Sequence, residues 1–152
     1  MKKGKVFGLI IVFLLVLIQF VPAGLPDTIA ENENDLLYNN QIPEQVAVIL
    51  KTSCYDCHSN ETNYPWYSYV APVSWLVGKD IREGREELNF SEWESLSKID
   101  KAKHLDNIID EVSDGDMPMN IYTIIHTDAK LSSEEIEQLA NWAEDYAESL
   151  FE

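Results

Sequence analysis

Apolar positions occur in two arrangements along the chain. Residues Val6–Val21 form an almost unbroken apolar run, interrupted by Gly8 and Gln19, and no charged residue occurs from position 6 to position 26. That length is enough to span a bilayer as a helix. In the remaining sequence apolar residues recur at helical spacing, no segment alternates over strand length, and no internal repeat is visible. The pattern predicts an all-α protein with an N-terminal hydrophobic segment.

Five segments of the C-terminal part are predicted to be helical because their apolar residues share one helical face. Capping-box patterns, which satisfy the free N–H groups at a helix start, occur at Ser91/Glu94 and Ser132/Glu135. Gly115 is placed to end the fourth helix. The expected fold is a compact domain of about five helices. The segments lie at about 43–53, 74–88, from 91, 100–113, and after 132.

The hydrophobic segment divides the chain into three predicted parts. Residues 1–23 carry Lys2, Lys3 and Lys5 before the apolar run, which is typical of a signal peptide or a membrane anchor. Small residues around Ala23 permit cleavage, so both interpretations stay open. Residues 24–40 are polar without a sustained period and are predicted to be a linker, and residues 41–152 form the domain. The domain is expected on the exported, periplasmic face of the membrane, anchored through residues 6–23 or secreted.

Net charge narrows the class of partner. The 152 residues include 11 basic and 27 acidic ones, for a formal charge of −16. Removal of residues 1–23 leaves −19, because that segment holds three lysines and no acid. Such a chain cannot neutralise phosphates, so nucleic-acid binding is excluded as a general function. We expect instead a redox protein partner with a basic docking patch.

The chemistry of the chain centres on Cys54-Tyr55-Asp56-Cys57-His58, a C-x-x-C-H motif. This spacing allows two thiols to bond covalently to one haem while the adjacent imidazole binds the iron, giving haem c. Three other interpretations of the cysteines are weaker. A thioredoxin-like pair requires a βαβ context, a zinc site requires two more ligands, and a disulfide between residues so close in sequence contributes little.

A second axial ligand is expected from Met117, which stands in the setting Gly115-Asp116-Met117-Pro118 after the fourth helix. Met119 is assigned to packing. His104 lies on the flank of a helix, and His126 is placed to hydrogen-bond near the haem edge. The aromatic residues of the segment 64–69 either wall the porphyrin or form a core under a loop.

Three stretches carry a resemblance to a known family: CYDCHSNETNYPWYSYVAPVSW, LNFSEW and GDMPMNIYTIIHTDAKLSSEEIEQLANW. Over about residues 42–146 the chain resembles the cytochrome c superfamily. It resembles more closely the bacterial haem-binding-domain family with an N-terminal membrane segment. The resemblance implies a cytochrome c-like α-helical domain around one haem, with His58 as proximal ligand, and it supports Met117 as distal ligand.

The expected function is therefore single-electron transfer by a mono-haem c-type cytochrome with His/Met ligation, rather than catalysis on a substrate of its own. One alternative is a peroxidase-like haem enzyme or a gas or redox sensor, which needs a displaceable sixth ligand. Another is a haem domain whose chemistry is set by neighbours in a larger membrane complex.

Overall fold

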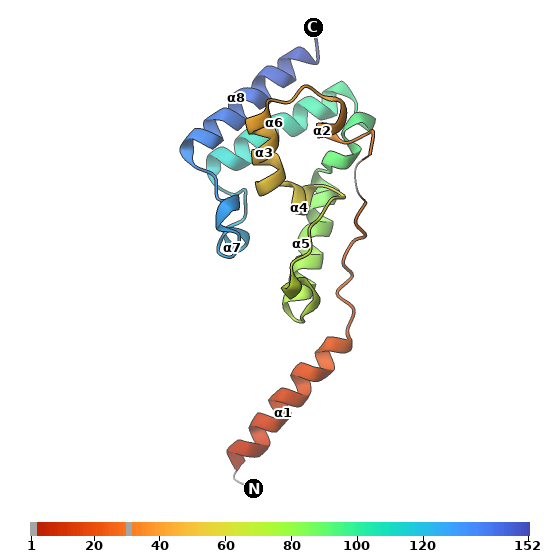
Figure 1. Cartoon of the computed structure of the whole chain (residues 1–152), viewed down its shortest axis with the longest axis vertical. Coiled ribbons are helices and arrows are strands. Elements are labelled where there is room, and N and C mark those ends of the chain that lie inside the picture. Colours follow the sequence, from red (N-terminus) through yellow and green to blue (C-terminus); the bar gives the residue numbers. More distant parts are fainter. Residues whose placement is uncertain (1–2, 30–31) are drawn as a thin grey trace.

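The chain folds into helices and connecting loops (Figure 1). The computed structural model describes residues 3–29 and 32–152, and every regular element within these ranges is helical. This confirms the all-α prediction. The long helices are α1 (Lys3–Leu17), α3 (Glu44–Ser53), α5 (Val73–Glu87), α6 (Lys98–Asp114) and α8 (Ser133–Ser149). The short helices are α2 (Leu36–Asn39), α4 (Tyr55–His58) and α7 (Asn120–Thr123), with 3-10 turns η1 (Ile18–Phe20), η2 (Trp66–Tyr69), η3 (Phe90–Ser95) and η4 (Thr127–Ala129).

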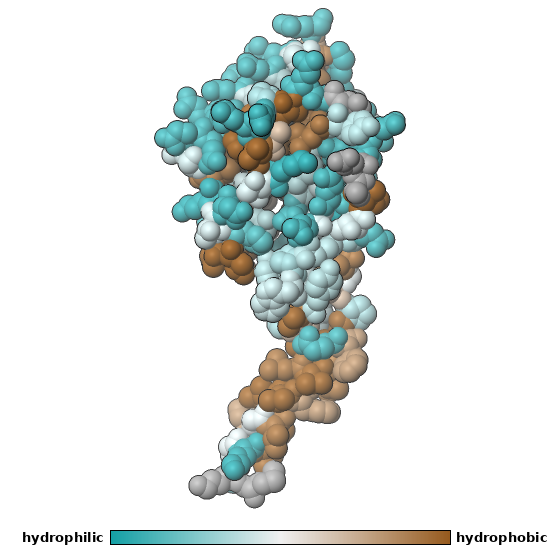
Figure 2. Space-filling view, viewed as in Figure 1, coloured by the Kyte–Doolittle hydropathy of each residue, from teal (hydrophilic) through white to brown (hydrophobic). Residues whose placement is uncertain are grey.

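The N-terminal helix stands away from the domain and buries none of its side chains (Figure 1). With η1 it forms an 18-residue helical segment, Lys3–Phe20, which among the described residues is the one long and apolar enough to cross a membrane. At 1.5 Å per residue this segment is about 27 Å long, close to the thickness of a bilayer's hydrocarbon core. Figure 2 shows its surface as almost continuously hydrophobic.

The hydrophobic core lies where α6 and α8 pack together and α3 contacts α8. Trp93, Leu105 and Leu139 are fully buried there. Ser132 and Glu135 form the predicted capping box at the start of α8, each side chain accepting from the other residue's backbone N–H. Gly115 ends α6 in the left-handed conformation at φ 79°, as predicted.

The expected capping box at Ser91 does not form. The segment is the 3-10 turn η3, and its cap is Asn89, whose side chain accepts from the backbone N–H of Ser91. The Ser91 hydroxyl is buried and donates to Asp35 Oδ2 at 3.1 Å. Asp35 Oδ1 accepts from the Tyr55 hydroxyl at 2.8 Å. A buried carboxylate needs such donors, and this demand overrides the local capping pattern.

The polar segment 24–40 contributes to the domain although its pattern predicts a linker. Asp35 caps α2 by accepting from the Leu37 N–H at 2.9 Å, and Leu36 is a fully buried member of the core. Earlier in the segment, the Tyr64 hydroxyl donates to the Pro26 carbonyl at 2.7 Å. The hydrophobic core therefore extends N-terminally of residue 41.

Leu36→Ala is expected to lower the free energy of unfolding by about 2–5 kcal/mol, because it leaves a cavity in a fully buried position. Denaturant unfolding of the full chain in detergent measures the change. Tyr38→Ala, at an exposed position of the same helix, is the control and should have little effect. If both variants lowered the free energy of unfolding by the same small amount, residues 35–40 would not contribute to the stability of the domain.

Candidate functional site

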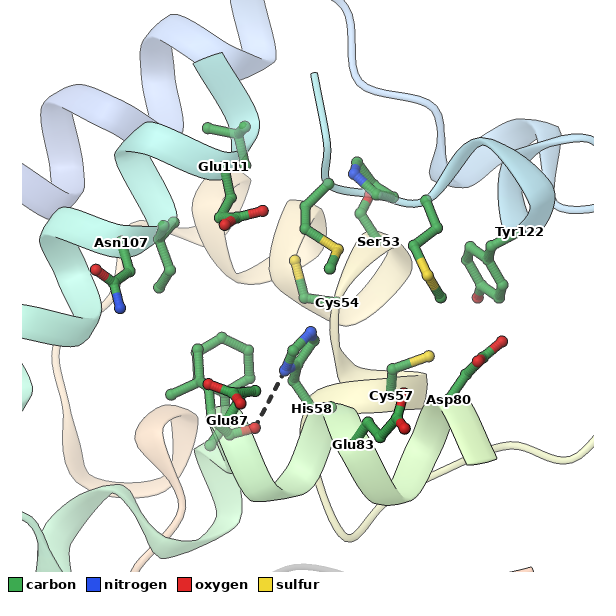
Figure 3. A pocket seen from close by; sticks show the side chains of 18 of the residues that line it. Ser53, Cys54, Cys57, His58, Asp80, Glu83, Glu87, Asn107, Glu111 and Tyr122 are labelled. Carbon is green, nitrogen blue, oxygen red and sulfur yellow. Dashed lines mark hydrogen bonds between the residues drawn. The ribbon is translucent and has the colours of Figure 1, made fainter. Parts of the chain in front are cut away.

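One helical turn brings the C-x-x-C-H residues together. The Cys54 carbonyl accepts from the backbone N–H of Cys57 at 3.2 Å and of His58 at 2.9 Å, so the chain closes a turn at the start of α4. Residues three and four apart on a helix share one face. Both sulfur atoms and the imidazole therefore face the same space, as Figure 3 shows.

That space is a cavity of about 360 Å³ bounded by α4 and α5 on one side and by α6 and the loop 115–119 on the other. Its volume lies within the range of roughly 300–1,000 Å³ that is usual for cofactor sites. The inner wall is apolar, and carboxylates of α5 and α6 surround it. The apolar lining residues are Leu88, Phe90, Ile108, Val112, Met117, Pro118 and Met119.

The His58 ring is held in one orientation. Its Nδ1 lies 3.1 Å from the Leu88 carbonyl oxygen, and because a carbonyl can only accept, Nδ1 carries the hydrogen. The Nε2 lone pair is then left for a ligand in the cavity, which is the arrangement that orients metal-binding histidines. Burial lowers the pKa of His58 below its usual value, which favours the neutral, ligating form.

The two thiols differ from those of redox-active pairs. Burial, followed by the neighbouring Cys57, raises the pKa of Cys54 to about 12. Burial, followed by Asp56 and Asp80, raises that of Cys57 to about 11. Both groups therefore hold their protons at neutral pH, whereas dithiol oxidoreductases depend on lowered pKa values in electropositive surroundings. The raised pKa values of both thiols therefore argue against the thioredoxin-like interpretation.

The loop after α6 brings Met117 to the same cavity. The Glu111 carbonyl accepts from the backbone N–H groups of Asp116 at 3.0 Å and of Met117 at 3.1 Å, which fixes the chain just beyond Gly115. The Met117 side chain lines the cavity and also packs against the core. Met119, which the sequence assigns to packing alone, lines the cavity as well.

Two helical faces that line the cavity, most of whose residues are polar, are not predicted from the sequence. On α5 the residues Asp80, Glu83, Gly84 and Glu87 line the cavity, and on α6 the residues His104, Asn107, Ile108 and Glu111 do so. Each set follows the spacing i, i+3, i+4, i+7 of a single helical face. The spacing was visible, but only the structure shows that these two faces oppose each other across the cavity.

The aromatic segment 64–69 does not wall this cavity. Tyr64 and Tyr67 instead line a second cavity of about 250 Å³, beside the first, and Trp66 is exposed. The Tyr67 hydroxyl hydrogen-bonds to His126 Nε2. The His126 ring stacks on Tyr122, with 4.2 Å between centroids, and Tyr122 lines both cavities.

The donor set in the main cavity fits a haem. It offers two thiols on one helical face, an imidazole with a free ring nitrogen, thioethers from the opposite loop, and an apolar interior. The cavity is a poorer site for zinc or another single metal ion, because the described residues contain no group of three or more His, Cys, Asp or Glu side chains that could bind one.

Comparison with known proteins agrees with this fit. The family model described as haem-binding domain matches residues 13–145. No curated protein and no solved structure matches the chain. Because the match covers most of the chain, the protein belongs to the haem-binding domain family, and haem is its cofactor.

Gly84 determines how closely α5 approaches the C-x-x-C-H turn. A Cβ atom at this position would lie 2.8 Å from the Cys57 carbonyl oxygen, which is too close. In an unconstrained helix a Gly-to-Ala change stabilises by roughly 0.5–1 kcal/mol, so a loss of stability isolates the clash.

We expect Gly84→Ala to lower the free energy of unfolding by about 1–3 kcal/mol and to reduce the haem content per polypeptide. Denaturant unfolding and haem quantification measure both. Glu86→Ala, at an exposed position on the same helix, is the matched control and should change neither. A Gly84→Ala variant as stable as the wild type would show that α5 can move away from Cys57 without cost.

Proposed function

We propose that this member of the haem-binding domain family is a mono-haem c-type cytochrome that transfers single electrons. In this proposal Cys54 and Cys57 hold the haem through two thioether bonds, His58 is the proximal ligand and Met117 the distal one. The chain would then belong to the cytochrome c superfamily. The observation that carries the proposal is that these four side chains line one cavity, three from a single helical turn and the fourth from a loop across it.

The proposed roles follow from the chemistry of each side chain. The Leu88 carbonyl orients His58, and the fixed loop backbone holds Met117 in place. A thioether is a soft, neutral ligand that favours the reduced metal and raises the reduction potential. When bound, the haem iron supplies a centre that gains and loses one electron. If His58 and Met117 both bound the iron, no coordination position would remain for a substrate, which favours electron transfer over catalysis.

The carboxylates beside the cavity support a basic partner. Glu83 and Glu87 of α5 and Glu111 of α6 are exposed and line its edge (Figure 3). The described residues that line the cavity include no Lys or Arg. A redox protein with a basic patch would be attracted to this edge, most strongly at low salt.

The N-terminal helix supports a location at the membrane. We propose that residues 1–23 direct export, that Lys3–Phe20 stays in the bilayer, and that the haem domain lies on the periplasmic face. The lysines at positions 2, 3 and 5, at the N-terminal end of this segment, favour a cytoplasmic N-terminus, which would place the following domain outside.

Covalent attachment is tested by acid–acetone extraction, which removes haem that is not bonded to the polypeptide. The wild-type colour should stay with the protein, whereas a Cys54→Ala/Cys57→Ala double variant should lose it. His58→Ala should fail to accumulate holoprotein, while His104→Ala, which changes the other histidine lining the cavity, should accumulate normally. Complete extraction from the wild type would refute c-type attachment, and the reverse result for the two histidines would move the proximal ligand to α6.

The sixth ligand is tested by comparing two methionines of one loop. Met117→Ala should keep the haem attached but lose the weak long-wavelength band of methionine-ligated ferric haem, lower the potential and bind cyanide faster. Met119→Ala should leave the spectrum and the potential unchanged. Exchanged behaviour would assign Met119 as the ligand. Wild-type spectra in both variants would exclude methionine ligation and favour the sensor or peroxidase-like alternative.

A further inference from the structure

Two segments without Asp, Glu, Lys or Arg meet at one end of this acidic domain. They are residues 62–78 and residues 117–127. The second cavity shows that they lie close together, since it is lined by Leu76 and Val77 of α5 and by Ile121 and Ile125 of the α7 region. Residues 24–152 carry a formal charge of −19, so an uncharged area of this size is unexpected in this part of the chain.

The surface formed by these segments is apolar and exposed. Trp66 is 77% exposed, Tyr69 66% and Ile124 75%. Other exposed apolar side chains of the same two segments complete what we call the uncharged face: Val70, Val73, Leu76, Ile121 and Ile125. In Figure 2 the end of the domain nearest α1 is mostly pale and brown, with brown at the position of α7, while teal dominates the opposite end.

Hydrogen bonds fix this face next to the end of the N-terminal helix. The Gln19 side chain donates from Nε2 to the Ala71 carbonyl at 3.1 Å and accepts the Ala71 N–H at Oε1, at 3.0 Å. Gln19 lies in η1, directly after α1, and Ala71 lies two residues beyond the end of η2. The Trp75 indole N–H donates to the Val21 carbonyl at 3.3 Å. These bonds therefore hold the uncharged face beside the C-terminal end of the apolar helix.

The segment that follows η1 is hydrogen-bonded along α5. Arg82 donates to the Gly24 carbonyl at 2.5 Å, and Arg85 donates to the Asp27 carbonyl at 3.0 Å. Gly78 permits this approach, because a Cβ atom there would lie 2.7 Å from the Ala23 carbonyl oxygen. These contacts restrict the orientation of the domain relative to α1.

We propose that the uncharged face lies in the interfacial region of the bilayer that α1 spans. This inference rests on the membrane anchoring proposed above. Exposed Trp and Tyr side chains favour the interface between water and lipid, where an apolar ring and a polar edge are both accommodated. Carboxylates lose hydration when they approach lipid, so an acidic domain held at the membrane approaches it most favourably through a face that lacks them.

A bilayer fits this face better than a protein partner does. The face is joined directly to a helix whose side chains are all exposed and whose length matches a membrane. Any protein covering the face would have to share that position with the lipid surrounding α1. The second cavity is lined in part by residues of this face and shares Cys57, Asp80, Met119 and Tyr122 with the main cavity.

Photo-crosslinking from lipid tests the proposal on the full chain. Holoprotein is placed in nanodiscs containing phosphatidylglycerol and a lipid with a diazirine in its acyl chain, at one chain per disc so that no second copy can cover the face. After illumination, mass spectrometry locates the lipid adducts. We expect adducts in residues 3–22 and also in 62–78 and 117–127.

Serine variants separate the face from the anchor. Trp66→Ser/Tyr69→Ser should reduce adducts in 62–78 several-fold, and Ile124→Ser should reduce those in 117–127, with adducts in 3–22 unchanged. Ile99→Ser is the matched control, since Ile99 is 73% exposed on α6 outside the face, and it should change nothing. Retained haem content verifies that each variant folds.

The outcomes distinguish the two proposals. Adducts confined to residues 3–22 would refute docking of the domain and leave the anchor in place. No adducts in 3–22 would refute the anchor, and docking with it. Adducts in 62–78 that persist in the double variant, or adducts spread over α6 and α8, would show that the domain meets lipid without a preferred face.

Discussion

The close packing of α4 against α5 is the contact on which the site depends. The helical turn at Cys54 places two thiols and an imidazole on one side, but a single turn of helix is too short to be stable alone. Gly84 lets α5 reach the Cys57 backbone, and the Leu88 carbonyl just beyond α5 holds His58. Helix α5 also supplies Glu83 and Glu87 of the acidic edge of the cavity, so one interface influences the orientation of His58, the shape of the cavity and its local charge.

A second buried interaction connects this turn to the rest of the domain. Asp35 accepts from the Tyr55 hydroxyl, and Tyr55 is the residue directly after Cys54. The other carboxylate oxygen of Asp35 accepts from the Ser91 hydroxyl of η3. Burial raises the pKa of Tyr55, as does the nearby Asp35 charge, so Tyr55 remains a donor across the physiological range. Residues before the first long helix of the domain thus stabilise the motif, although their polarity suggests a linker.

The sequence predicts features that depend on neighbouring residues and fails where distant ones decide. The capping box at Ser132 and the glycine stop at Gly115 involve residues a few positions apart, and both form as expected. The pattern at Ser91 is equally good, but its hydroxyl is taken by Asp35, 56 positions away. His104 shows the same limit: its spacing from Glu111 marks a helical face, yet its place in the cavity follows from how α5 and α6 oppose each other.

The distribution of charge gives the domain two distinct sides, which bears on where the proposed electron transfer would take place. Carboxylates border the main cavity, where a basic partner would be attracted from water, whereas the uncharged face lies beside α1. Tyr122 lines both cavities, so the main cavity, with its acidic edge, adjoins the second cavity, which residues of the uncharged face line. If the domain rotated freely on a flexible tether, the acidic edge would meet anionic headgroups in many orientations. The bonds from Gln19, Arg82 and Arg85 to the backbone restrict that freedom, which in the proposed arrangement would keep the acidic edge available to a partner protein.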